Sequence, residues 1–232
     1  MTASTAPAGP VVCRRLGLVD YQTAWQDMRD FTDRRSPQTA DEIWFLEHPP
    51  VYTLGLNGRP EHLLAPGSIP VVRTDRGGQV TYHGPGQLVV YPLIDLARRG
   101  FGPRRLVSLL EQSTVDCLAD FGIAAHSRAE APGVYVESCK IASIGLRIRR
   151  GASYHGLALN VDNDLAPFRG IDPCGFRGLE MTRIVDCGGP GAVAEVTRRL
   201  EAHLLARLRA APAVTDPVQG AVGASRKALS RS

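Results

Sequence analysis

Apolar residues recur along this chain with two spacings, one typical of helices and one typical of strands. Three segments have the helical spacing: residues 21–31, 103–121 and 192–209. Asp20 precedes the first as a plausible N-cap, and Pro103 suits the first turn of the second. The buried stripe of the second segment comprises Leu106, Leu109, Leu110, Cys117, Leu118 and Phe121. We therefore expect three helices, with the cysteine of this stripe as a core thiol.

Short runs rich in β-branched, aromatic and leucine residues, bounded by Gly or Pro, predict the strands. These runs are 42–47, 51–54, 69–74, 79–82, 87–91, 133–138, 140–149 and 153–161. The last two are typical of a hairpin closing through residues 150–152, and a short helical turn follows near 165–169. Strands and helices interleave without a regular βαβ rhythm. The pattern predicts an α+β fold with a central mixed, mostly antiparallel sheet flanked by helices.

Length and composition fit one domain with peripheral ends. The chain has 232 residues, 44% of them hydrophobic, which is enough to bury a sizeable core. Residues 1–10 and 211–232 are rich in small residues, Pro and Gly, so we expect two flexible tails around a single domain of residues 11–210. No basic segment followed by an apolar run begins the chain, and no apolar run approaches about 18 residues. The sequence therefore predicts a cytoplasmic protein with no membrane association.

The cysteines and charges exclude several classes of protein. The five cysteines are odd in number, irregularly spaced and without a CxxC motif, which argues against a disulfide framework and against a metal site. The formal net charge is +4, with arginines clustered at 98–99, 104–105 and 147–150. Such clusters could bind an acidic protein or simply form a solvated face. There is no helix-turn-helix pattern or aromatic RNA-binding motif, so we expect no nucleic-acid partner.

Residues 76–92 (RGGQVTYHGPGQLVVYP) join two strand-like runs through a loop rich in Gly and Pro. Glycine allows positive φ and close approach of the backbone to a ligand, so the loop is typical of a binding site. A hairpin with a hydrogen-bonded histidine explains the same residues. The nucleotide-binding patterns GxxxxGK[ST] and GxGxxG are absent. His83 here, and His155 in a second Gly-flanked segment, are either core histidines or residues lining an active site.

Lys140 has an unusual place in its predicted strand. If residues 140–149 form a regular strand, Lys140 faces the apolar side with Ala142 and Ile144, while Arg147 and Arg149 face the other side. Such a lysine is either a strand-end residue reaching for water or a buried ammonium that acts as a base or as a partner for an anion. The residues alone leave both interpretations open.

Cys174 lies in the turn sequence Ile171–Gly175 (IDPCG). A thiol on a rigid turn is poised for exposure, and Gly175 leaves the sulfur open to a substrate carbonyl. The alternative is a structural thiol. A neighbouring cation would stabilise the thiolate, and a basic amine could relay the proton in acyl transfer. Spacing along the sequence does not show whether Lys140 and Cys174 meet.

Three segments together resemble one known family. They are RGGQVTYHGPGQLVVYP at 76–92, KIASIGLRIRRGASYHGLALNVD at 140–162 and GIDPCG at 170–175. In this order they are similar to the octanoyltransferases of lipoate biosynthesis, the lipoyl(octanoyl) transferases. The resemblance covers roughly residues 15–205. It implies a fold like that of the biotin and lipoate protein ligases, with a central mixed sheet flanked by helices.

The resemblance implies transfer of an octanoyl group from octanoyl-acyl-carrier protein to a specific lysine of a lipoyl domain, by way of an enzyme thioester. The implied acceptors are the lipoyl domains of 2-oxoacid dehydrogenase complexes and the glycine cleavage H protein. Because exchange between thioesters is nearly isoenergetic, neither ATP nor another cofactor is implied. Acyl carrier proteins and lipoyl domains are generally acidic, so the arginine clusters suit their docking.

The family's functional residues fall on matching positions of this sequence. Its acyl-thioester cysteine falls on Cys174, and its cysteine-activating lysine falls on Lys140. Its substrate-binding residues fall on Arg76, Gly77, Gly78, Gln79, Val80, Thr81, Tyr82, His83, Ser143, Ile144, Gly145, Gly156, Leu157 and Ala158. The small residues among them leave room for an acyl chain, with apolar neighbours as its wall.

Two other functions fit parts of the sequence. An ATP-dependent lipoate–protein ligase would share the fold, but it forms an acyl-adenylate and has no need of Cys174. A non-catalytic module that binds an acidic carrier protein or a nucleic acid through its arginines would show salt-sensitive binding and no covalent intermediate. A thioester at the cysteine distinguishes the transferase from both.

Overall fold

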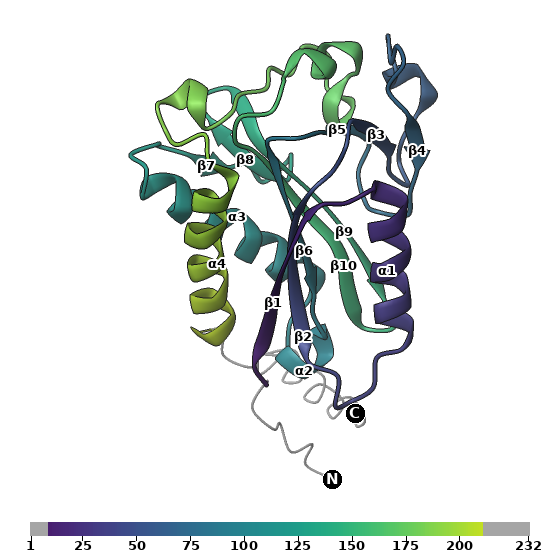
Figure 1. Ribbon diagram of the computed structural model, residues 1–232, viewed down its shortest axis with the longest axis vertical. Coiled ribbons are helices and arrows are strands. Elements are labelled where there is room, and N and C mark those ends of the chain that lie inside the picture. The colour runs from purple at the N-terminus through teal and green to yellow at the C-terminus, as the bar shows by residue number, and fades with distance from the viewer. Residues whose placement is uncertain (1–8, 211–232) are drawn as a thin grey trace, which may run out of the picture.

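A seven-stranded sheet forms the centre of the molecule, whose computed structural model describes residues 9–210 (Figure 1). The strand order is β1-β2-β6-β10-β9-β8-β7. The first two strands are parallel and every other neighbouring pair is antiparallel. The strands are β1 (Val11–Leu18), β2 (Asp41–Glu47), β6 (Gln87–Leu93), β7 (His126–Ser127), β8 (Gly133–Val136), β9 (Cys139–Arg149) and β10 (Ala152–Asn160). The predicted α+β fold with a mixed, mostly antiparallel sheet is confirmed.

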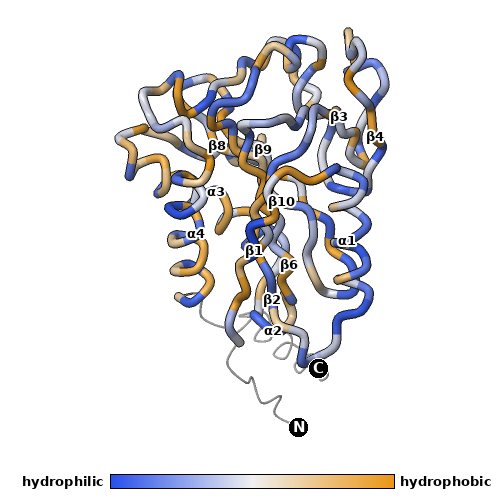
Figure 2. The backbone as a smooth tube through the Cα atoms, in the orientation of Figure 1, coloured by the Kyte–Doolittle hydropathy of each residue, from blue (hydrophilic) through white to orange (hydrophobic). Residues whose placement is uncertain are grey.

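Helices cover both faces of this sheet. Helix α1 (Tyr21–Asp33) lies on one face, and α3 (Pro103–Ala119) and α4 (Val193–Ala210) lie on the other (Figure 1). Alternate residues of β2 and β6 therefore enter two different hydrophobic clusters. Because both faces are covered, every residue of β6 is buried. Figure 2 shows hydrophilic and hydrophobic residues interleaved along α4, as expected for a helix with one buried face.

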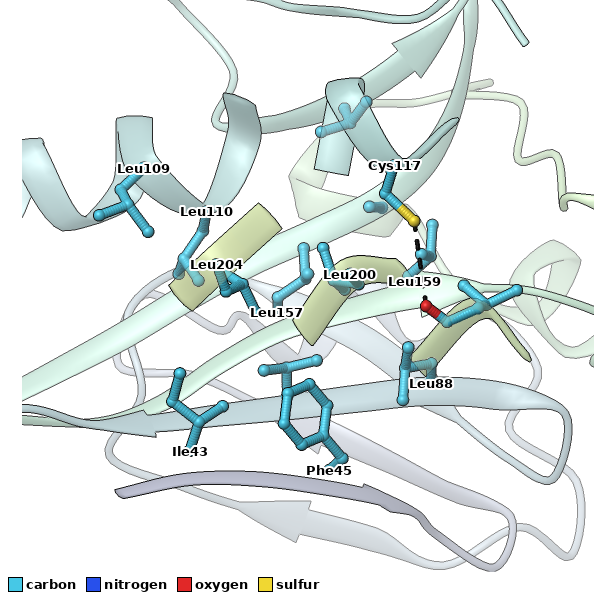
Figure 3. Close-up of a cluster of buried hydrophobic side chains, with 14 of the residues drawn as sticks. Ile43, Phe45, Leu88, Leu109, Leu110, Cys117, Leu157, Leu159, Leu200 and Leu204 are labelled. Atoms are coloured by element: carbon cyan, nitrogen blue, oxygen red, sulfur yellow. Dashed lines mark hydrogen bonds between the residues drawn. The ribbon is translucent and has the colours of Figure 1, made fainter. Parts of the chain in front are cut away.

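The larger cluster joins α3 and α4 to the sheet (Figure 3). Leu110 and Leu200 are fully buried there, against Phe45 and Leu157 of the strands. Cys117 is also fully buried, its Sγ lies 3.9 Å from the Val196 carbonyl oxygen, and burial raises the pKa of the thiol to about 12. The predicted core thiol is confirmed.

A second, three-stranded sheet sits at the upper end of the molecule in Figure 1. Its order is β4 (Val71–Arg73), β3 (Val51–Leu54) and β5 (Val80–His83). The sheet packs on the short 3₁₀ turn η2 (Ala166–Gly170). The loop between β4 and β5 is tied to the main sheet because Gly77 N–H donates to the Leu146 carbonyl of β9 at 2.9 Å. This loop contains Gly77 and Gly78, whereas Gly84 and Gly86 of the same Gly-rich segment lie between β5 and β6.

Several elements differ from the predicted ones. The strand β1, the short helix α2 (Leu96–Arg99) and β7 were not predicted. The strand predicted at 69–74 is limited to Val71–Arg73, and the helix predicted to reach Phe121 ends at Ala119. The chain reverses there through Gly122, which has φ +75°. The remaining 3₁₀ turns are η1 (Pro60–His62), η3 (Pro173–Gly175) and η4 (Val185–Cys187).

The tails predicted at 1–10 and 211–232 lie almost entirely outside the described residues. Within residues 9–210, no helix is both long and apolar enough to cross a bilayer.

Arginines of two of the predicted clusters form ion pairs with carboxylates of the same chain. Arg98 and Arg99 both contact the fully buried Asp41 side chain at 2.6 Å, and Arg35 contacts it at the same distance. Arg149 and Arg150 lie at the surface, 2.7 and 3.9 Å from the partly exposed Asp33. Arg98 and Arg99 are therefore bound to Asp41 within the fold, and docking of an acidic partner by the clustered arginines stays a prediction. Within the described chain, the clustered arginines without a carboxylate within 4.0 Å are Arg104, Arg105 and Arg147.

Candidate active site

Lys140 and Cys174 meet although 34 positions separate them in the sequence. The Nζ of Lys140 lies 3.1 Å from the Sγ of Cys174 and also donates to the Pro132 carbonyl at 2.9 Å. The lysine is 1% exposed, whereas Cys174 is half-buried. A buried amine in contact with an accessible thiol is an arrangement suited to nucleophilic catalysis by the sulfur.

The turn that carries the thiol is strained. Cys174 is the middle residue of η3 and has φ +57°, a left-handed conformation that side chains other than Gly seldom adopt. The Gly175 N–H donates to the Asp172 carbonyl at 2.9 Å and so closes the turn. Strain of this kind persists only where the surroundings hold it, and it is common at catalytic residues. Here it fixes the sulfur in front of Lys140.

A β-bulge directs Lys140 to the thiol. On β8, Val134 pairs with Ala142 but the next residue, Tyr135, pairs with Lys140, so Ile141 is an extra residue in β9. Val134 and Ala142 belong to the main core, whereas Lys140 lies beside the Tyr135 ring with Nζ 5.4 Å from its centroid. The prediction that Lys140 shares a face with Ala142 is wrong, because it assumed a regular strand.

Gly133 makes the space for the lysine side chain. Its φ is +139°, and an added Cβ would lie 2.5 Å from Lys140 Cε and 3.0 Å from its Nζ. The same Cβ would lie 2.5 Å from the Ala142 carbonyl oxygen. A side chain at this position is therefore incompatible with the observed place of the ammonium.

A pocket with about 480 Å³ of atom-free space, partly open to solvent, extends from the thiol. It brings together the Gly-rich loop, the two central hairpin strands and the cysteine turn. Its lining comprises Tyr21, Arg76, Gly78, Gln79, Val80, Thr81, His83, Val89, Tyr91, Ser143, Ile144, Gly145, His155, Gly156, Leu157, Ala158 and Cys174. Twelve of the fourteen predicted substrate-binding residues are in this lining; Gly77 and Tyr82 are not.

The two exceptions have other contacts. Tyr82 points to the opposite side of β5, where its ring packs 5.6 Å from that of Tyr52 and 5.5 Å from that of Phe168. Gly77 uses both of its backbone groups, because its carbonyl accepts from Arg76 and its N–H donates to the Leu146 carbonyl, each at 2.9 Å. Both residues support the loop without reaching the cavity surface.

Two facing glycines form part of the pocket wall. Gly145 of β9 pairs with Gly156 of β10. An added Cβ would lie 2.7 Å from the Gly77 carbonyl oxygen in the first case and 2.1 Å from the Val90 carbonyl oxygen in the second. Close backbone packing therefore requires glycine at both positions, in addition to any need for space in the pocket.

Arg76 brings an unusual positive charge to the pocket. It is 8% exposed and donates to the backbone carbonyls of Thr53, Gly77 and Gln79, with further bonds to the Thr53 hydroxyl. These acceptors are all neutral, and burial lowers the pKa of the guanidinium. Such a charge favours a negative or polarised group in the pocket.

The candidate histidines are both buried and uncharged. Burial lowers the pKa of His83 well below its ordinary value, and His83 shares a hydrogen bond of 2.8 Å with Gln87. His155 has φ +55° within β10, and its Nε2 donates to Asp75 at 2.8 Å. Burial lowers its pKa also, although Asp75 opposes that effect. Both line the pocket as neutral hydrogen-bonding groups.

The pocket contains residues that sequence reasoning missed. Tyr21 begins α1 and Tyr91 lies in β6, and both were read as parts of ordinary elements. Val89 completes this wall. Their aromatic or apolar character is equally typical of a core, so residue type did not distinguish them, although Val89 and Tyr91 belong to the segment 76–92. In the described part of the chain, no three His, Cys, Asp or Glu side chains are arranged to hold a metal ion.

Comparisons with known proteins indicate the family to which this chain is related. A family model described as the lipoyl protein ligase A/B catalytic domain matches residues 20–205. The chain is 60% identical over 205 residues to the octanoyltransferase of Aromatoleum aromaticum, covering 88% of this chain and 87% of that protein. It is 60% identical over 203 residues to the octanoyltransferase of Azotobacter vinelandii, covering 87% and 93%.

A solved structure of lipoate-protein ligase A bound with ATP has the same fold. The TM-score is 0.71 at 15% sequence identity, and the match covers 86% of this chain and 85% of that one. At this level of identity the likeness concerns the fold alone.

Proposed function

Since the chain belongs to the family of lipoyl protein ligase A/B catalytic domains, we propose that it is an octanoyltransferase, the activity named for relatives that share up to 60% of its residues. It is an acyltransferase that moves an octanoyl group onto lipoyl proteins. The observation that carries the mechanism is the contact of 3.1 Å between Lys140 Nζ and Cys174 Sγ. The catalytic unit is a single domain of residues 11–210.

In the first half-reaction the Cys174 sulfur attacks the thioester carbonyl of octanoyl-acyl-carrier protein. The new C–S bond forms as the bond to the carrier's thiol breaks, and the proton of Cys174 passes through Lys140 to the leaving sulfur. One thioester replaces another, so no ATP, metal or cofactor is needed. The positive charge of Lys140 and that of Arg76 favour the negative charge that develops at the reacting atoms.

In the second half-reaction the neutral amine of the acceptor lysine attacks the thioester on Cys174. The amide bond forms, the Cys174 sulfur leaves, and the proton released by the amine returns to it through Lys140. The acceptor is a specific lysine of a lipoyl domain in 2-oxoacid dehydrogenase complexes and in the glycine cleavage H protein. The enzyme acts in the cytoplasm.

The pocket holds the octanoyl chain. Among the predicted substrate-binding residues, Ile144, Leu157 and Ala158 give the pocket wall an apolar surface against the chain, and Ser143 adds a hydroxyl to the lining. Gly77 and Tyr82 do not line the pocket and support the loop and strand that form it. An ATP-dependent ligase on the same fold is not favoured, because the ligase likeness is one of fold at 15% identity.

Intact mass after brief incubation with octanoyl-acyl-carrier protein tests the mechanism. The wild type should gain one octanoyl group that hydroxylamine removes, and Cys174→Ser should gain none. Cys117→Ser is a matched control, because that thiol is buried in the core away from the pocket. If wild type shows no adduct, and lipoyl-domain acylation requires ATP and free acid, the proposed mechanism is wrong and the enzyme is a ligase.

A further inference from the structure

One peptide group connects a carboxylate on α3 to the Lys140 ammonium. The carbonyl oxygen of Pro132 accepts from Lys140 Nζ at 2.9 Å. The N–H of Gly133, which belongs to the same peptide group, donates to Glu111 Oε1 at 2.9 Å. The peptide is planar, so the two hydrogen bonds act at opposite ends of one rigid unit. The contact of Lys140 with Cys174 extends this connection to the sulfur.

Lys140 has no carboxylate partner of its own among residues 9–210, where no Asp or Glu oxygen lies within 4.0 Å of Nζ. Its side chain is nevertheless 1% exposed. A buried ammonium needs well-placed acceptors, because water does not replace them. The Pro132 carbonyl is therefore essential to its position, and a peptide that bonds at both ends is a stronger acceptor than one that bonds at one end.

The elements around this peptide fix its place. Glu111 belongs to α3, and the neighbouring Leu110 anchors that helix in the main core. Within the described chain, the carboxylate of Glu111 makes one hydrogen bond, and its donor is the Gly133 N–H. Gly133 itself has φ +139° and leaves the space in which the Lys140 side chain lies. The carboxylate thus holds a loop whose position decides where the ammonium can be.

We propose that Glu111 is a positioning residue for the thioester chemistry. It holds the Pro132–Gly133 peptide so that the carbonyl keeps the Lys140 ammonium against the Cys174 sulfur. This inference rests on the proposed function of the lysine–cysteine pair. Carboxylate, peptide, ammonium and thiol form one connected series, in which the acid orients the group that assists the nucleophile. Glu111 does not touch the acyl group.

Alkylation of Cys174 by iodoacetamide tests the proposal. The rate is followed across the pH range from the mass of the peptide that contains residue 174, so the other cysteines do not interfere. Glu111→Leu removes the acceptor, Glu111→Gln keeps an acceptor oxygen, and Lys140→Met marks the effect of losing the ammonium. Glu130→Gln is the matched control, because that carboxylate is exposed near the same loop and has no hydrogen bond in the described chain.

With Glu111→Leu, the midpoint of the rate profile should move to higher pH, toward that of Lys140→Met, and alkylation near neutral pH should slow about tenfold. Glu111→Gln should restore the wild-type profile, and Glu130→Gln should leave it unchanged. A folded Glu111→Leu protein with the wild-type profile would overturn the proposal. If that variant does not fold, Glu111→Asp, which is too short to reach the Gly133 N–H, gives the same test with the same criterion.

This assay is separate from the test of the proposed function. Alkylation requires no acyl donor, so the connection from Glu111 to Cys174 can be measured even if octanoyl transfer fails. Conversely, a thioester on the wild type with no response to Glu111→Leu would leave the octanoyltransferase intact and remove Glu111 from its mechanism.

Discussion

Replacing Gly133 with Ala should disable the thiol without touching it. The added Cβ would lie 2.5 Å from Lys140 Cε, while ordinary contacts begin at 3.4 Å, so the lysine must move by 3.4 − 2.5 = 0.9 Å. A displacement of about 1 Å at a catalytic group can lower a rate about 100-fold, or about 2.7 kcal/mol in activation free energy. The positive φ of this residue, together with the 2.5 Å contact of the added Cβ with the Ala142 carbonyl oxygen, should also cost about 1–3 kcal/mol of stability in the variant.

The rate of thioester formation, followed by quenched intact mass in a single turnover, measures the first effect. Urea unfolding measures the second. Gly122→Ala is the matched control, because Gly122 has φ +75° but an added Cβ there meets nothing within 4 Å. The control should lose stability and keep its rate. If folded Gly133→Ala forms the thioester at the wild-type rate, the precise place of Lys140 does not matter and this reasoning is refuted.

Three further changes test the core, the buried histidines and the pocket wall. Leu110→Ala removes a fully buried side chain and should cost about 2–5 kcal/mol in urea unfolding; a loss below about 1 kcal/mol would contradict the packing described. Burial lowers the pKa of His48 to about 4, so the unfolded chain binds a proton that the folded one does not, and stability should fall as pH drops from about 6.5 to about 4. His48→Gln should reduce that dependence, with the remainder due to His83 and His155, and an unchanged slope would rule His48 out as a source. Gly156→Ala places a Cβ 2.1 Å from the Val90 carbonyl oxygen, so a loss of about 1–3 kcal/mol in thermal unfolding is expected, and wild-type stability would show that the strands separate freely.

Local patterns were sufficient for most of the elements. The strand predicted at 51–54 is Val51–Leu54, and the hairpin of β9 and β10 closes where the sequence indicated. Asp20 caps α1 as predicted, because its carboxylate accepts from the Thr23 N–H at 3.0 Å. These features depend on residues close together in the chain. The conformational preferences of those residues therefore predict them from the sequence. The fold class and the family resemblance were also confirmed.

Features that depend on residues far apart in the chain could not be predicted from the sequence. The edge strand β1 is held by parallel pairing with β2, and its sequence, which includes two arginines and a glycine, lacks a clear strand pattern. The direction of Lys140 depends on a bulge that arises from the pairing of β9 with β8. Tyr21 and Tyr91 line the pocket because the start of α1 meets the middle of β6.

The sequence by itself determined which residues are candidates for chemistry: the Gly-rich loop, Lys140 and Cys174 could be named from motifs and their resemblance to a family. Only the tertiary structure decided that the ammonium meets the sulfur at 3.1 Å and that Gly133 and Glu111 stand behind the lysine. The physical reason is that motifs record residue types, whereas contacts between strands, turns and helices far apart in the chain depend on pairing register and on packing against the core.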